Sequence, residues 1–517
     1  MNVFLSVPRS EHRREVVTIV VLAAVKLALH LAFNGRYGYF RDELYYIACG
    51  DHLDWGYVDQ APLIPVVARV TRALLGDSLL ALRFLPAVAG AGIVVLTALM
   101  VRELGGRQRA IMVAGVGIIA APIYLSYSYL LSTNSFEPLF WMGSTYVLIR
   151  ILNGGDHRLW LLLGAIIGLG MENKHSMAFF AAALVAGLLL TPQRKLLGGP
   201  WPWLGVLTAY LLAAPNLLWQ MQHDWPTWEL LNNIRNSHKN VVLGPAQYFA
   251  QQILLMNPVA FPLWMGGLLW LLLAPKGRPY RALGWSYLAA LTIFVVLKGK
   301  SYYLAPSYPM LVAAGSVLAA DFAERVRHRW MVPAYAGAIA VSGALLAPLA
   351  LPVLPAEQVP AYLKAIHVES PQTETSHTAT LPQMFADQFG WEEMVASVSD
   401  VYHSLPPEQQ KHARIFGQNY GEAGAIDFFG RKYGLPPAIS GHQNYFLWGP
   451  HGADGKVLVV LDDNPGSLPE ICGSVEDRGP IRSHPLAMPW EQRLRIYICH
   501  DMKVTPEVLW PKLKVWL

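Results

Sequence analysis

The sequence predicts a polytopic α-helical membrane protein of about eleven transmembrane helices, followed by a C-terminal α/β domain. The chain of 517 residues is 54% hydrophobic and only 15% charged, whereas soluble domains carry about 25% charged residues. The apolar excess lies between residues 16 and 351, in repeated runs of membrane-spanning length. The residues that follow have a soluble composition. We therefore expect two domains, residues 1–351 and residues 352–517.

The apolar runs locate the expected transmembrane helices. The first run is too long for a cleavable signal peptide and lacks a small-residue cleavage site, so we expect it to be retained as a helix. Lys26 and His30 within it, and Asn216 in a later run, are polar groups that we expect to form hydrogen bonds inside the bundle. The runs cover residues 16–33, 82–101, 110–130, 136–151, 159–172, 176–190, 203–220, 250–274, 283–297, 303–321 and 331–351.

Basic residues in the short loops predict the orientation. Lys and Arg recur in every second loop, from residues 9–14 before the first helix to residues 325–329 after the tenth, and loops of this kind stay in the cytoplasm. We therefore expect a multi-pass membrane protein with a cytoplasmic N-terminus. An odd number of helices places residues 352–517 on the extracytoplasmic side. The net charge of +5 comes from these short clusters, which argues against a nucleic-acid partner because such a partner requires a contiguous basic face.

An acidic pair follows directly on the first helix. Asp42 and Glu43 belong to the segment Arg-Asp-Glu-Leu-Tyr-Tyr at residues 41–46. Carboxylates beside a bilayer are rare unless they have a partner or a task. As an alternative, Asp42 could cap an interfacial helix that starts at Glu43, with Arg41 as its surface partner. Glu43 could orient its neighbour, bind a substrate or complement the dipole of the first helical turn.

Further polar residues are expected on the same, extracytoplasmic side. The loop at 34–81 contains Asp59, and its residues 62–75 fit an amphipathic interfacial helix with Arg69 and Arg72 on one face. Glu137 comes at the start of a helix. Two basic segments complete the set, Lys174-His175 in a short loop and Lys-Gly-Lys-Ser-Tyr-Tyr at residues 298–303.

Each of these residues also has a purely structural interpretation. Lys298 and Lys300 fit lysines that extend along the membrane edge toward water, and the two tyrosines that follow fit an aromatic belt. The Lys174-His175 loop fits a hydrated hairpin. Glu137 fits a carboxylate at a helix start.

These segments, in this order, resemble the integral-membrane glycosyltransferases of the GT-C type, in the branch (glycosyltransferase family 39-like) that contains protein O-mannosyltransferases and bacterial lipid A aminoarabinose transferases. The resemblance covers about residues 16–320. Residues 41–46 resemble the family's Asp-Glu-x-x-Tyr/Phe motif, residues 59–63 its acidic-Lys-Pro-Pro segment, and residues 298–309 its late basic-aromatic-Pro segment. Gln60 stands where the family often has a lysine that meets the donor phosphate. The resemblance implies the GT-C fold for the membrane domain and a location in the bacterial inner (plasma) membrane.

The resemblance implies an inverting transfer of a sugar from a polyprenyl-phosphate donor to an extracytoplasmic acceptor, which is a lipid, a glycan or a protein. The family's catalytic carboxylate matches Asp42, which would accept the proton of the acceptor hydroxyl, with Glu43 beside it. Cations must offset the charge of the leaving phosphate. The candidates for this role are Lys298, Lys300, Lys174, His175, Arg69 and Arg72. Candidates for substrate binding are Asp59, Glu137, Tyr302 and Tyr303.

No cofactor is expected, since no His/Asp spacing fits a metal site, although Glu137 could hold a divalent metal. The expected partners are the lipid-linked donor, membrane lipid and the acceptor. A transporter or flippase of lipid-linked sugars is the alternative function. That alternative predicts internal hydropathy repeats and paired broken helices at the membrane midplane, and neither is clear in the sequence.

The C-terminal residues predict a small α/β domain. Helix-like stretches at 389–403 and 407–412 are followed by β-rich runs at 456–461 and 494–499. Residues 419–423 and 440–442 resemble the extracytoplasmic domain of bacterial members of the family. These residues belong to two candidate segments, 417–422 and 440–442. They fall at expected strand ends, where α/β folds place binding loops. Acceptor handling is the functional hypothesis for them, and ordinary turns are the alternative. Cys472 and Cys499 could form a disulfide in an oxidising compartment or remain free thiols.

Overall fold

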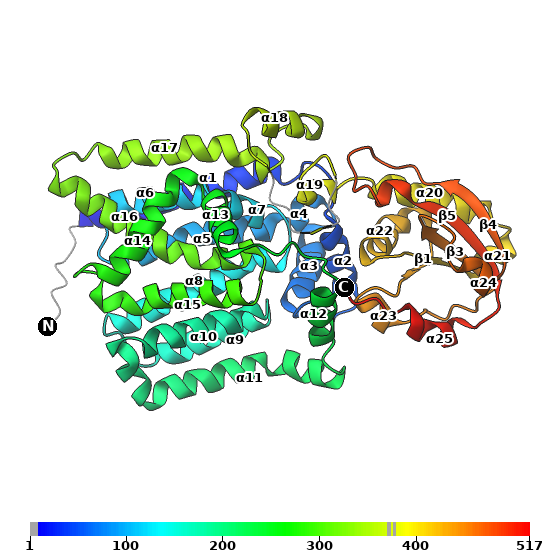
Figure 1. Ribbon diagram of the computed structural model, residues 1–517, viewed down its shortest axis with the longest axis horizontal. Helices are drawn as coiled ribbons and strands as arrows, with labels where there is room; N and C mark the ends of the chain where they lie inside the picture. The colour runs from blue at the N-terminus through cyan, green and yellow to red at the C-terminus, as the bar shows by residue number, and fades with distance from the viewer. Residues whose placement is uncertain (1–8, 370–373, 376–378) are drawn as a thin grey trace. The chain divides into compact units, whose positions relative to one another are not determined.

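The computed structural model describes residues 9–369, 374–375 and 379–517. The chain divides into two compact units that interleave along the sequence (Figure 1). A helical unit comprises residues 1–35, 80–218 and 242–353, and a mixed unit comprises residues 36–79, 219–241 and 354–517. The long loop after the first helix therefore packs with the C-terminal residues, although more than half of the chain separates them. The predicted division at residue 351 describes composition along the chain, whereas packing joins the first loop to the C-terminal region.

Every predicted apolar run is helical in the structure. The helices that lie wholly or mostly in the helical unit are α1 (Arg9–Phe33), α4 (Leu79–Leu82), α5 (Phe84–Glu103), α6 (Gln108–Ile119), α7 (Pro122–Tyr127), α8 (Thr133–Leu152), α9 (Leu159–Met171), α10 (Ser176–Leu189), α11 (Pro200–Gln222), α13 (Pro245–Leu255), α14 (Phe261–Leu273), α15 (Arg281–Val296), α16 (Tyr308–Arg325) and α17 (Met331–Leu346). The 3₁₀-helix η4 (Ser301–Ser307) leads into α16.

Two of the predicted runs are not single helices, and proline explains both breaks. The run at 110–130 divides into α6 and α7, because Pro122 lacks the N–H that would continue the helix. The run at 250–274 bends by 101° between α13 and the segment that begins at Pro258. At that bend Asn257 has φ +72°, a left-handed conformation that asparagine tolerates better than most residues.

Among the described residues, five helices are long and apolar enough to cross a membrane, or seven if each of two bent pairs forms one span. Two shorter apolar helices, α6 and α9, add to these. The predicted total of about eleven crossings stays a prediction. The predicted class, a polytopic α-helical protein with a small C-terminal sheet domain, is confirmed.

Polar residues inside the first helix have partners in the bundle, as predicted. Lys26 donates to the backbone oxygen of Tyr124 at 2.9 Å, and the ring of His30 lies 3.2 Å from the side-chain oxygen of Asn34. Asn34 in turn donates to the backbone oxygen of Arg83. Satisfying such groups internally is what makes them tolerable where water is absent.

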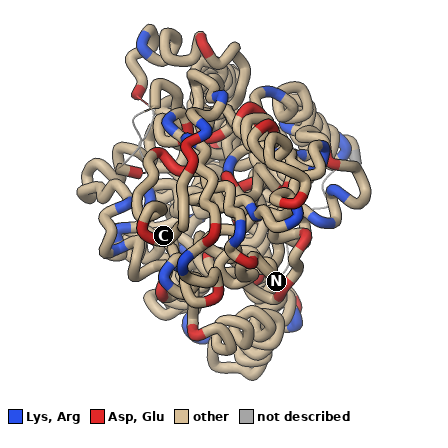
Figure 2. The backbone as a smooth tube through the Cα atoms, turned by 90° about the vertical axis from the view of Figure 1, so that its right-hand side faces the viewer, with Lys and Arg blue, Asp and Glu red and all other residues tan. Residues whose placement is uncertain are grey.

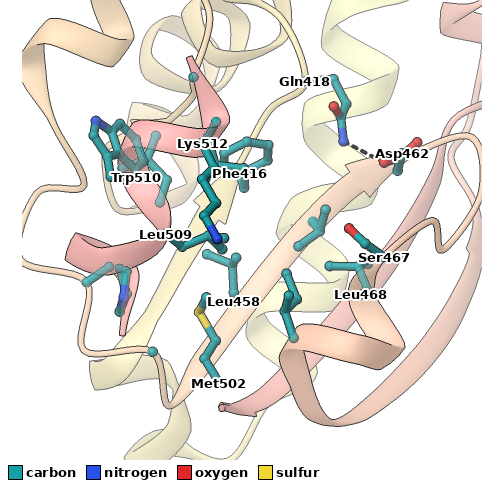
Figure 3. A pocket seen from close by; sticks show the side chains of 18 of the residues that line it. Phe416, Gln418, Leu458, Asp462, Ser467, Leu468, Met502, Leu509, Trp510 and Lys512 are labelled. Atoms are coloured by element: carbon teal, nitrogen blue, oxygen red, sulfur yellow. Dashed lines mark hydrogen bonds between the residues drawn. The ribbon is translucent and has the colours of Figure 1, made fainter. Parts of the chain in front are cut away.

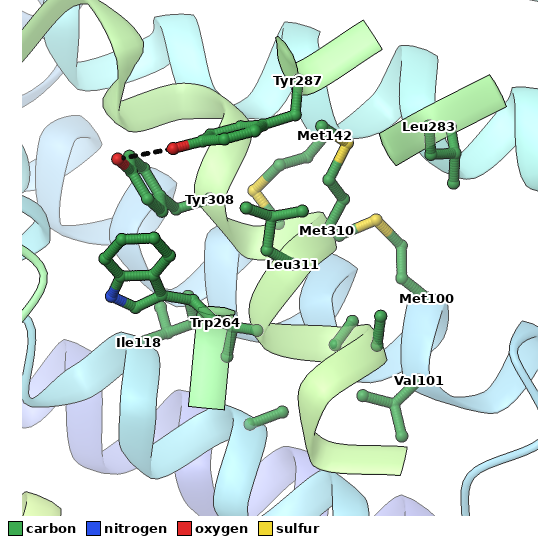
Figure 4. Close-up of a cluster of buried hydrophobic side chains, with 14 of the residues drawn as sticks. Met100, Val101, Ile118, Met142, Trp264, Leu283, Tyr287, Tyr308, Met310 and Leu311 are labelled. Carbon is green, nitrogen blue, oxygen red and sulfur yellow. Dashed lines mark hydrogen bonds between the residues drawn. The ribbon is translucent and has the colours of Figure 1, made fainter. Parts of the chain in front are cut away.

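The core of the helical unit is formed by close packing of α5, α6, α8, α14, α15 and α16 (Figure 4). Trp264, Met310 and Leu311 interdigitate there, and the hydroxyl of Tyr287 donates to that of Tyr308 at 3.0 Å. Two glycines let α14 and α16 touch backbone to backbone. A Cβ on Gly267 would lie 1.9 Å from the Leu311 oxygen, and one on Gly315 would lie 1.8 Å from the Leu263 oxygen. Small residues serve this purpose at helix interfaces in membranes.

The mixed unit is built around a five-stranded sheet in the order β2-β1-β3-β5-β4. β1 pairs parallel with both β2 and β3, whereas β5 runs antiparallel to its neighbours β3 and β4. The strands are β1 (Ala413–Phe416), β2 (Ala438–Ile439), β3 (Val457–Asp462), β4 (Cys472–Pro480) and β5 (Arg495–Met502). The two β-rich runs predicted from the sequence correspond to β3 and β5, so that prediction is confirmed.

The helices of the mixed unit include the two expected from the C-terminal sequence, α20 and α21. They are α2 (Arg41–Asp51), α3 (Leu63–Leu75), α12 (Pro226–Asn236), α18 (Val359–Ala365), α19 (Gln383–Ala386), α20 (Trp391–Ser404), α21 (Pro407–His412), α22 (Tyr420–Phe429), α23 (Asn444–Trp448), α24 (Leu468–Ile471) and α25 (Pro506–Leu509). The predicted amphipathic helix at 62–75 is α3, which buries Ile64, Ala68 and Thr71 on one face.

A disulfide joins Cys472 to Cys499 and so links β4 to β5. Of the two alternatives for these cysteines, the bridge is therefore the one that the structure shows. Cys49 is buried and unbridged. In Figure 2, positions of Lys and Arg are interspersed with positions of Asp and Glu on the side that faces the viewer.

Candidate catalytic site

Helix α2 places Asp42 at its first turn, and Glu43 is the residue that caps this helix. Phe40 precedes the helix in an extended conformation, and its backbone N–H donates to the Glu43 carboxylate at 2.9 Å. Glu43 is fully buried. The alternative in which Asp42 caps a helix that starts at Glu43 is therefore wrong, because the helix starts at Arg41. The position of Glu43 indicates a structural role, whereas its predicted catalytic role stays untested.

The Asp42 carboxylate is partly exposed and held by one strong hydrogen bond. Its side chain is 29% exposed. The hydroxyl of Tyr420, the first residue of α22, donates to Oδ1 of Asp42 at 2.7 Å. The Arg41 Nε atom lies 3.7 Å from the same oxygen. This carboxylate is thus oriented and stabilised, yet it retains exposed surface through which a substrate can reach it.

Asp59 is a second carboxyl group in the same unit. The hydroxyl of Tyr45 donates to its Oδ1 atom at 3.0 Å, and the rings of Tyr45 and Tyr420 lie 4.7 Å apart. Burial raises the pKa of Asp59 to about 7, and the nearby charge of Asp42 acts in the same direction. Near neutral pH, Asp59 is therefore present in both its protonated and its ionised form, whether it contacts substrate or only holds Tyr45 by a hydrogen bond.

Carboxyl groups with raised pKa values should make this protein more stable in mild acid. Burial raises the pKa of Asp59 and Glu491 to about 7 and that of Asp387 and Asp427 to about 6. Between about pH 4 and pH 7 these four groups bind more protons in the folded state than in the unfolded state, so their contribution to the free energy of unfolding falls as pH rises. Burial lowers the pKa of His442 to about 3, and this group acts in the opposite direction below about pH 6.5. We expect the melting temperature of the purified protein in detergent to drop between pH 5 and pH 7.5.

Asp59→Asn should flatten part of that pH dependence, because the amide cannot ionise. Asp400, whose side chain is 73% exposed in a surface ion pair, offers a matched control, and Asp400→Asn should retain the full slope. An Asp59→Asn protein with the wild-type slope would show that Asp59 is already ionised in the folded state.

The two arginines of α3 are engaged with a different carboxylate. Arg69 and Arg72 both contact Asp51 at 3.0 Å, and Arg431 donates to it at 2.5 Å. Burial favours the neutral form of Asp51, but the hydrogen bonds from Arg431 and Arg72 hold its pKa below the usual value. Asp51 ends helix α2, about 14 Å along the axis from Asp42 at 1.5 Å per residue. The predicted phosphate-binding role of Arg69 and Arg72 stays untested. Asp51 offsets part of their charge, and Asp77 also pairs with Arg72.

In the helical unit, Lys174 and Glu137 form an ion pair. The Lys174 ammonium lies 2.9 Å from the buried Glu137 carboxylate, 2.6 Å from the Asn134 side-chain oxygen and 4.6 Å from the centre of the Tyr303 ring. The Ser176 hydroxyl donates to the other carboxylate oxygen. Glu137 therefore positions Lys174, and a phosphate or sugar that binds there meets both groups together.

His175 lies next in the chain but points to another partner. Its Nε2 atom is 2.8 Å from the side-chain oxygen of Asn216. Burial lowers the pKa of His175, so the neutral imidazole is favoured. A neutral ring can hydrogen-bond a substrate, but it cannot offset the charge of a phosphate.

The late basic-aromatic segment joins the Lys174 group in the helical unit. Tyr303 lies under Lys174, and the Tyr302 ring packs edge-on against Tyr303 at 4.9 Å. Lys300 lies directly before η4 and is half-buried. Its charge and that of Lys174 both interact electrostatically with the Tyr303 phenol. Lys298 is exposed and has φ +55°. Of the two predicted lysines, Lys300 is thus the one associated with this cluster.

The described residues contain no group of three or more His, Cys, Asp or Glu side chains arranged to hold a metal ion. Independence from metal stays a prediction.

A cavity of about 270 Å³ opens on one face of the sheet in the mixed unit (Figure 3). Phe416, Leu458 and Met502 form apolar walls, and Gln418 at its edge donates to Asp462 at 2.6 Å. Gln418 belongs to the segment 417–422, singled out from the sequence. The same segment contains Tyr420, whose hydroxyl donates to Asp42. Gln418 therefore lies at this cavity, whereas Tyr420 lies at the candidate catalytic carboxylate. Sequence reasoning found the segment but not that contact.

Comparisons with known proteins concern the family and the fold of this chain. The family model described as dolichyl-phosphate-mannose-protein mannosyltransferase matches residues 59–219. The lipid A galacturonosyltransferase RgtD of Rhizobium johnstonii is 26% identical over 227 residues, which are 43% of this chain and 47% of RgtD. The match thus spans about half the length of this relative.

Solved structures extend the likeness to nearly the whole chain. ArnT from Cupriavidus metallidurans, in a crystal structure bound to undecaprenyl phosphate, has a TM-score of 0.58 and covers 93% of this chain and 97% of ArnT at 15% identity. Arabinofuranosyltransferase AftD from Mycobacteria has a TM-score of 0.54 and covers 93% of this chain and 40% of AftD at 14% identity. At this level of identity the likeness shows a shared fold. This chain therefore has the GT-C fold that its motifs implied, and over part of its length its sequence is similar to glycosyltransferases.

Proposed function

We propose that this protein is an inverting glycosyltransferase that moves a sugar from a polyprenyl-phosphate donor to the hydroxyl of an extracytoplasmic lipid, glycan or protein. The observation that carries the proposal is the set of contacts and the exposure of the Asp42 side chain. This carboxylate is not used to cap its helix, is oriented by Tyr420 and remains 29% exposed. It also occupies the position of the catalytic carboxylate in the motif at residues 41–46. RgtD, a lipid A galacturonosyltransferase that matches part of this sequence, supports sugar transfer. The undecaprenyl phosphate bound in the crystal structure of ArnT, which shares the fold, supports a polyprenyl-phosphate ligand.

The reaction requires one base and one cationic site. Asp42 accepts the proton of the acceptor hydroxyl while the acceptor oxygen forms a bond to the anomeric carbon. The bond from that carbon to the phosphate oxygen breaks, and the lipid phosphate leaves with the electron pair. Attack opposite the leaving group inverts the anomeric centre. The leaving phosphate is a weak base, so it needs positive charge more than it needs a proton, and we assign Lys300 and Lys174 to supply that charge.

Mass spectrometry of the cell envelope can identify the product directly. Envelope glycolipids and glycans from cells with and without the protein are compared, and a missing sugar names the product. Purified protein with the matching polyprenyl-phosphate sugar should then form that product with inversion. Movement of an unaltered lipid-linked sugar across proteoliposomes, without a new glycosidic bond, would instead favour a flippase.

Residues 352–517 should lie outside the cytoplasm, as the alternation of basic loops predicts. A reporter fused after residue 360 should be active as alkaline phosphatase and dark as a cytoplasmic fluorescent protein. Fusions in the basic loop at 325–329 should behave in the opposite way. Fluorescence from the fusion after residue 360 would mean that the number of membrane crossings is even.

A further inference from the structure

We propose that Tyr420 is a positioning residue for the base and that α22 of the C-terminal region is therefore an integral part of the transferase site. This inference rests on the proposed function, because it concerns how Asp42 is held. Asn419 caps α22 by accepting the backbone N–H groups of Gly421 and Glu422 at 2.8 and 3.0 Å. The cap fixes where the helix begins, so Tyr420 is held at its first turn with its hydroxyl on Asp42.

The Tyr420 ring is restrained on several sides. It stacks on the His442 ring at 4.9 Å and packs against the Tyr45 ring at 4.7 Å. The Arg41 guanidinium lies 5.4 Å from the ring centre. The backbone N–H of Tyr420 also donates to Nδ1 of His442 at 3.2 Å. A ring packed in this way has little freedom to swing, so its hydroxyl is directed at Asp42 before any substrate arrives. Such preorganisation is what a catalytic group requires.

Two glycines on α22 set the spacing between α22 and α2. A Cβ on Gly421 would lie 2.4 Å from Cγ of Arg41, and one on Gly424 would lie 3.0 Å from the backbone carbon and oxygen of Leu44. The two helices are therefore in contact along a seam that admits no larger residue at position 424 without a shift. The backbone N–H of Arg41 makes a further link by donating to the Asp387 oxygen at 3.1 Å. The close approach brings the Tyr420 hydroxyl within 2.7 Å of the carboxylate.

The hydrogen bond has a predictable effect on the chemistry. It occupies Oδ1 of Asp42 and leaves the other oxygen for the acceptor proton. The titratable and charged groups that face Asp42 are Arg41 and Tyr46 on α2, Asp59 after it, Asp387 before α20, and Tyr420 on α22. Tyr420 is the one of these that the structure shows hydrogen-bonded to the carboxylate through its side chain.

Tyr420→Phe removes the hydroxyl and keeps the packed ring. A hydrogen bond to a charged group contributes roughly 1.5–3 kcal/mol, so we expect kcat to fall by about tenfold or more. The KM for the donor should stay near the wild-type value. Tyr402→Phe is the matched control, because it loses a hydroxyl bond to the Gln410 oxygen in the same unit but away from Asp42.

A double-mutant cycle separates positioning from general damage. In an Asp42→Asn background, Tyr420→Phe should cause no further loss, because its effect acts through the carboxylate. Gly424→Val should reproduce the loss of kcat by pushing α22 away from α2, and Gly337→Val, at a helical glycine of α17 with open space around it, should show the effect of a valine in a helix without that displacement.

The outcomes distinguish this inference from the proposed function. If Asp42→Asn retains only a small residual rate and Tyr420→Phe keeps the wild-type kcat, Tyr420 does not position the base. The inference is equally overturned if Tyr420→Phe lowers the rate by the same factor in the Asp42→Asn background. Normal turnover by Asp42→Asn, or no transfer by the wild-type protein on the product named by mass spectrometry, overturns the proposed function itself.

Discussion

Asp42→Asn should abolish sugar transfer while leaving the protein folded. The amide retains the size of the carboxylate and can still accept the Tyr420 hydrogen bond, but it cannot take up a proton. Loss of a general base lowers kcat by about 10²–10⁴-fold. The cap of α2 should survive, because Glu43 rather than Asp42 accepts the Phe40 N–H.

The measurement is turnover by purified protein in detergent or proteoliposomes, with the donor identified from the envelope comparison. Asp400→Asn is the matched control, since it makes the same chemical change at an exposed ion pair of the mixed unit, where such pairs contribute little. Both variants should melt near the wild-type temperature. Turnover by Asp42→Asn within a few-fold of wild type would exclude Asp42 as the base.

Lys300→Gln should weaken use of the donor more than Lys298→Gln does. Lys300 is half-buried and its charge reaches Tyr303, which also lies under Lys174, whereas Lys298 is exposed. A charge-assisted bond to phosphate is worth roughly 1.5–3 kcal/mol. The expected result for Lys300→Gln is therefore a decrease of about 10–100-fold in kcat/KM for the donor, with a small change for Lys298→Gln. The test is steady-state kinetics against donor concentration, with binding of polyprenyl phosphate alone as a second readout.

Arg69→Gln is the informative comparison for this prediction. Arg69 is exposed and shares Asp51 with Arg72 and Arg431, so its loss should have little effect on folding. If Arg69→Gln loses donor use while Lys300→Gln retains it, the phosphate site belongs to the loop after the first helix. Lys174→Gln answers a different question, because it leaves the buried Glu137 carboxylate without its cation, which costs about 3–5 kcal/mol in comparable buried pairs.

Hydrophobic length and periodicity were sufficient to predict most of the helices and the principal strands. The apolar runs of this chain are helical because a lipid environment requires each backbone group to be satisfied within its own segment. Where the predictions were wrong, as at residues 110–130 and 250–274, Pro122 and Pro258 interrupt the runs. Those prolines were visible in the sequence, but helices in membranes often tolerate proline, so its effect depended on the neighbouring helices.

The sequence by itself determined the membrane class, the helical runs, the acidic pair after the first helix and the basic-aromatic segment before the last core helix. These features are local, since each depends on a short stretch of side chains and on the backbone chemistry of that stretch. Only the tertiary structure decided that Glu43 caps α2, that Glu137 is paired with Lys174, and that Tyr420 reaches Asp42 from the other end of the chain. Such contacts join residues with no pattern in common along the sequence. They depend on helix packing, here on glycines such as Gly424 that let two backbones approach within contact distance, and spacing along one chain does not encode that distance.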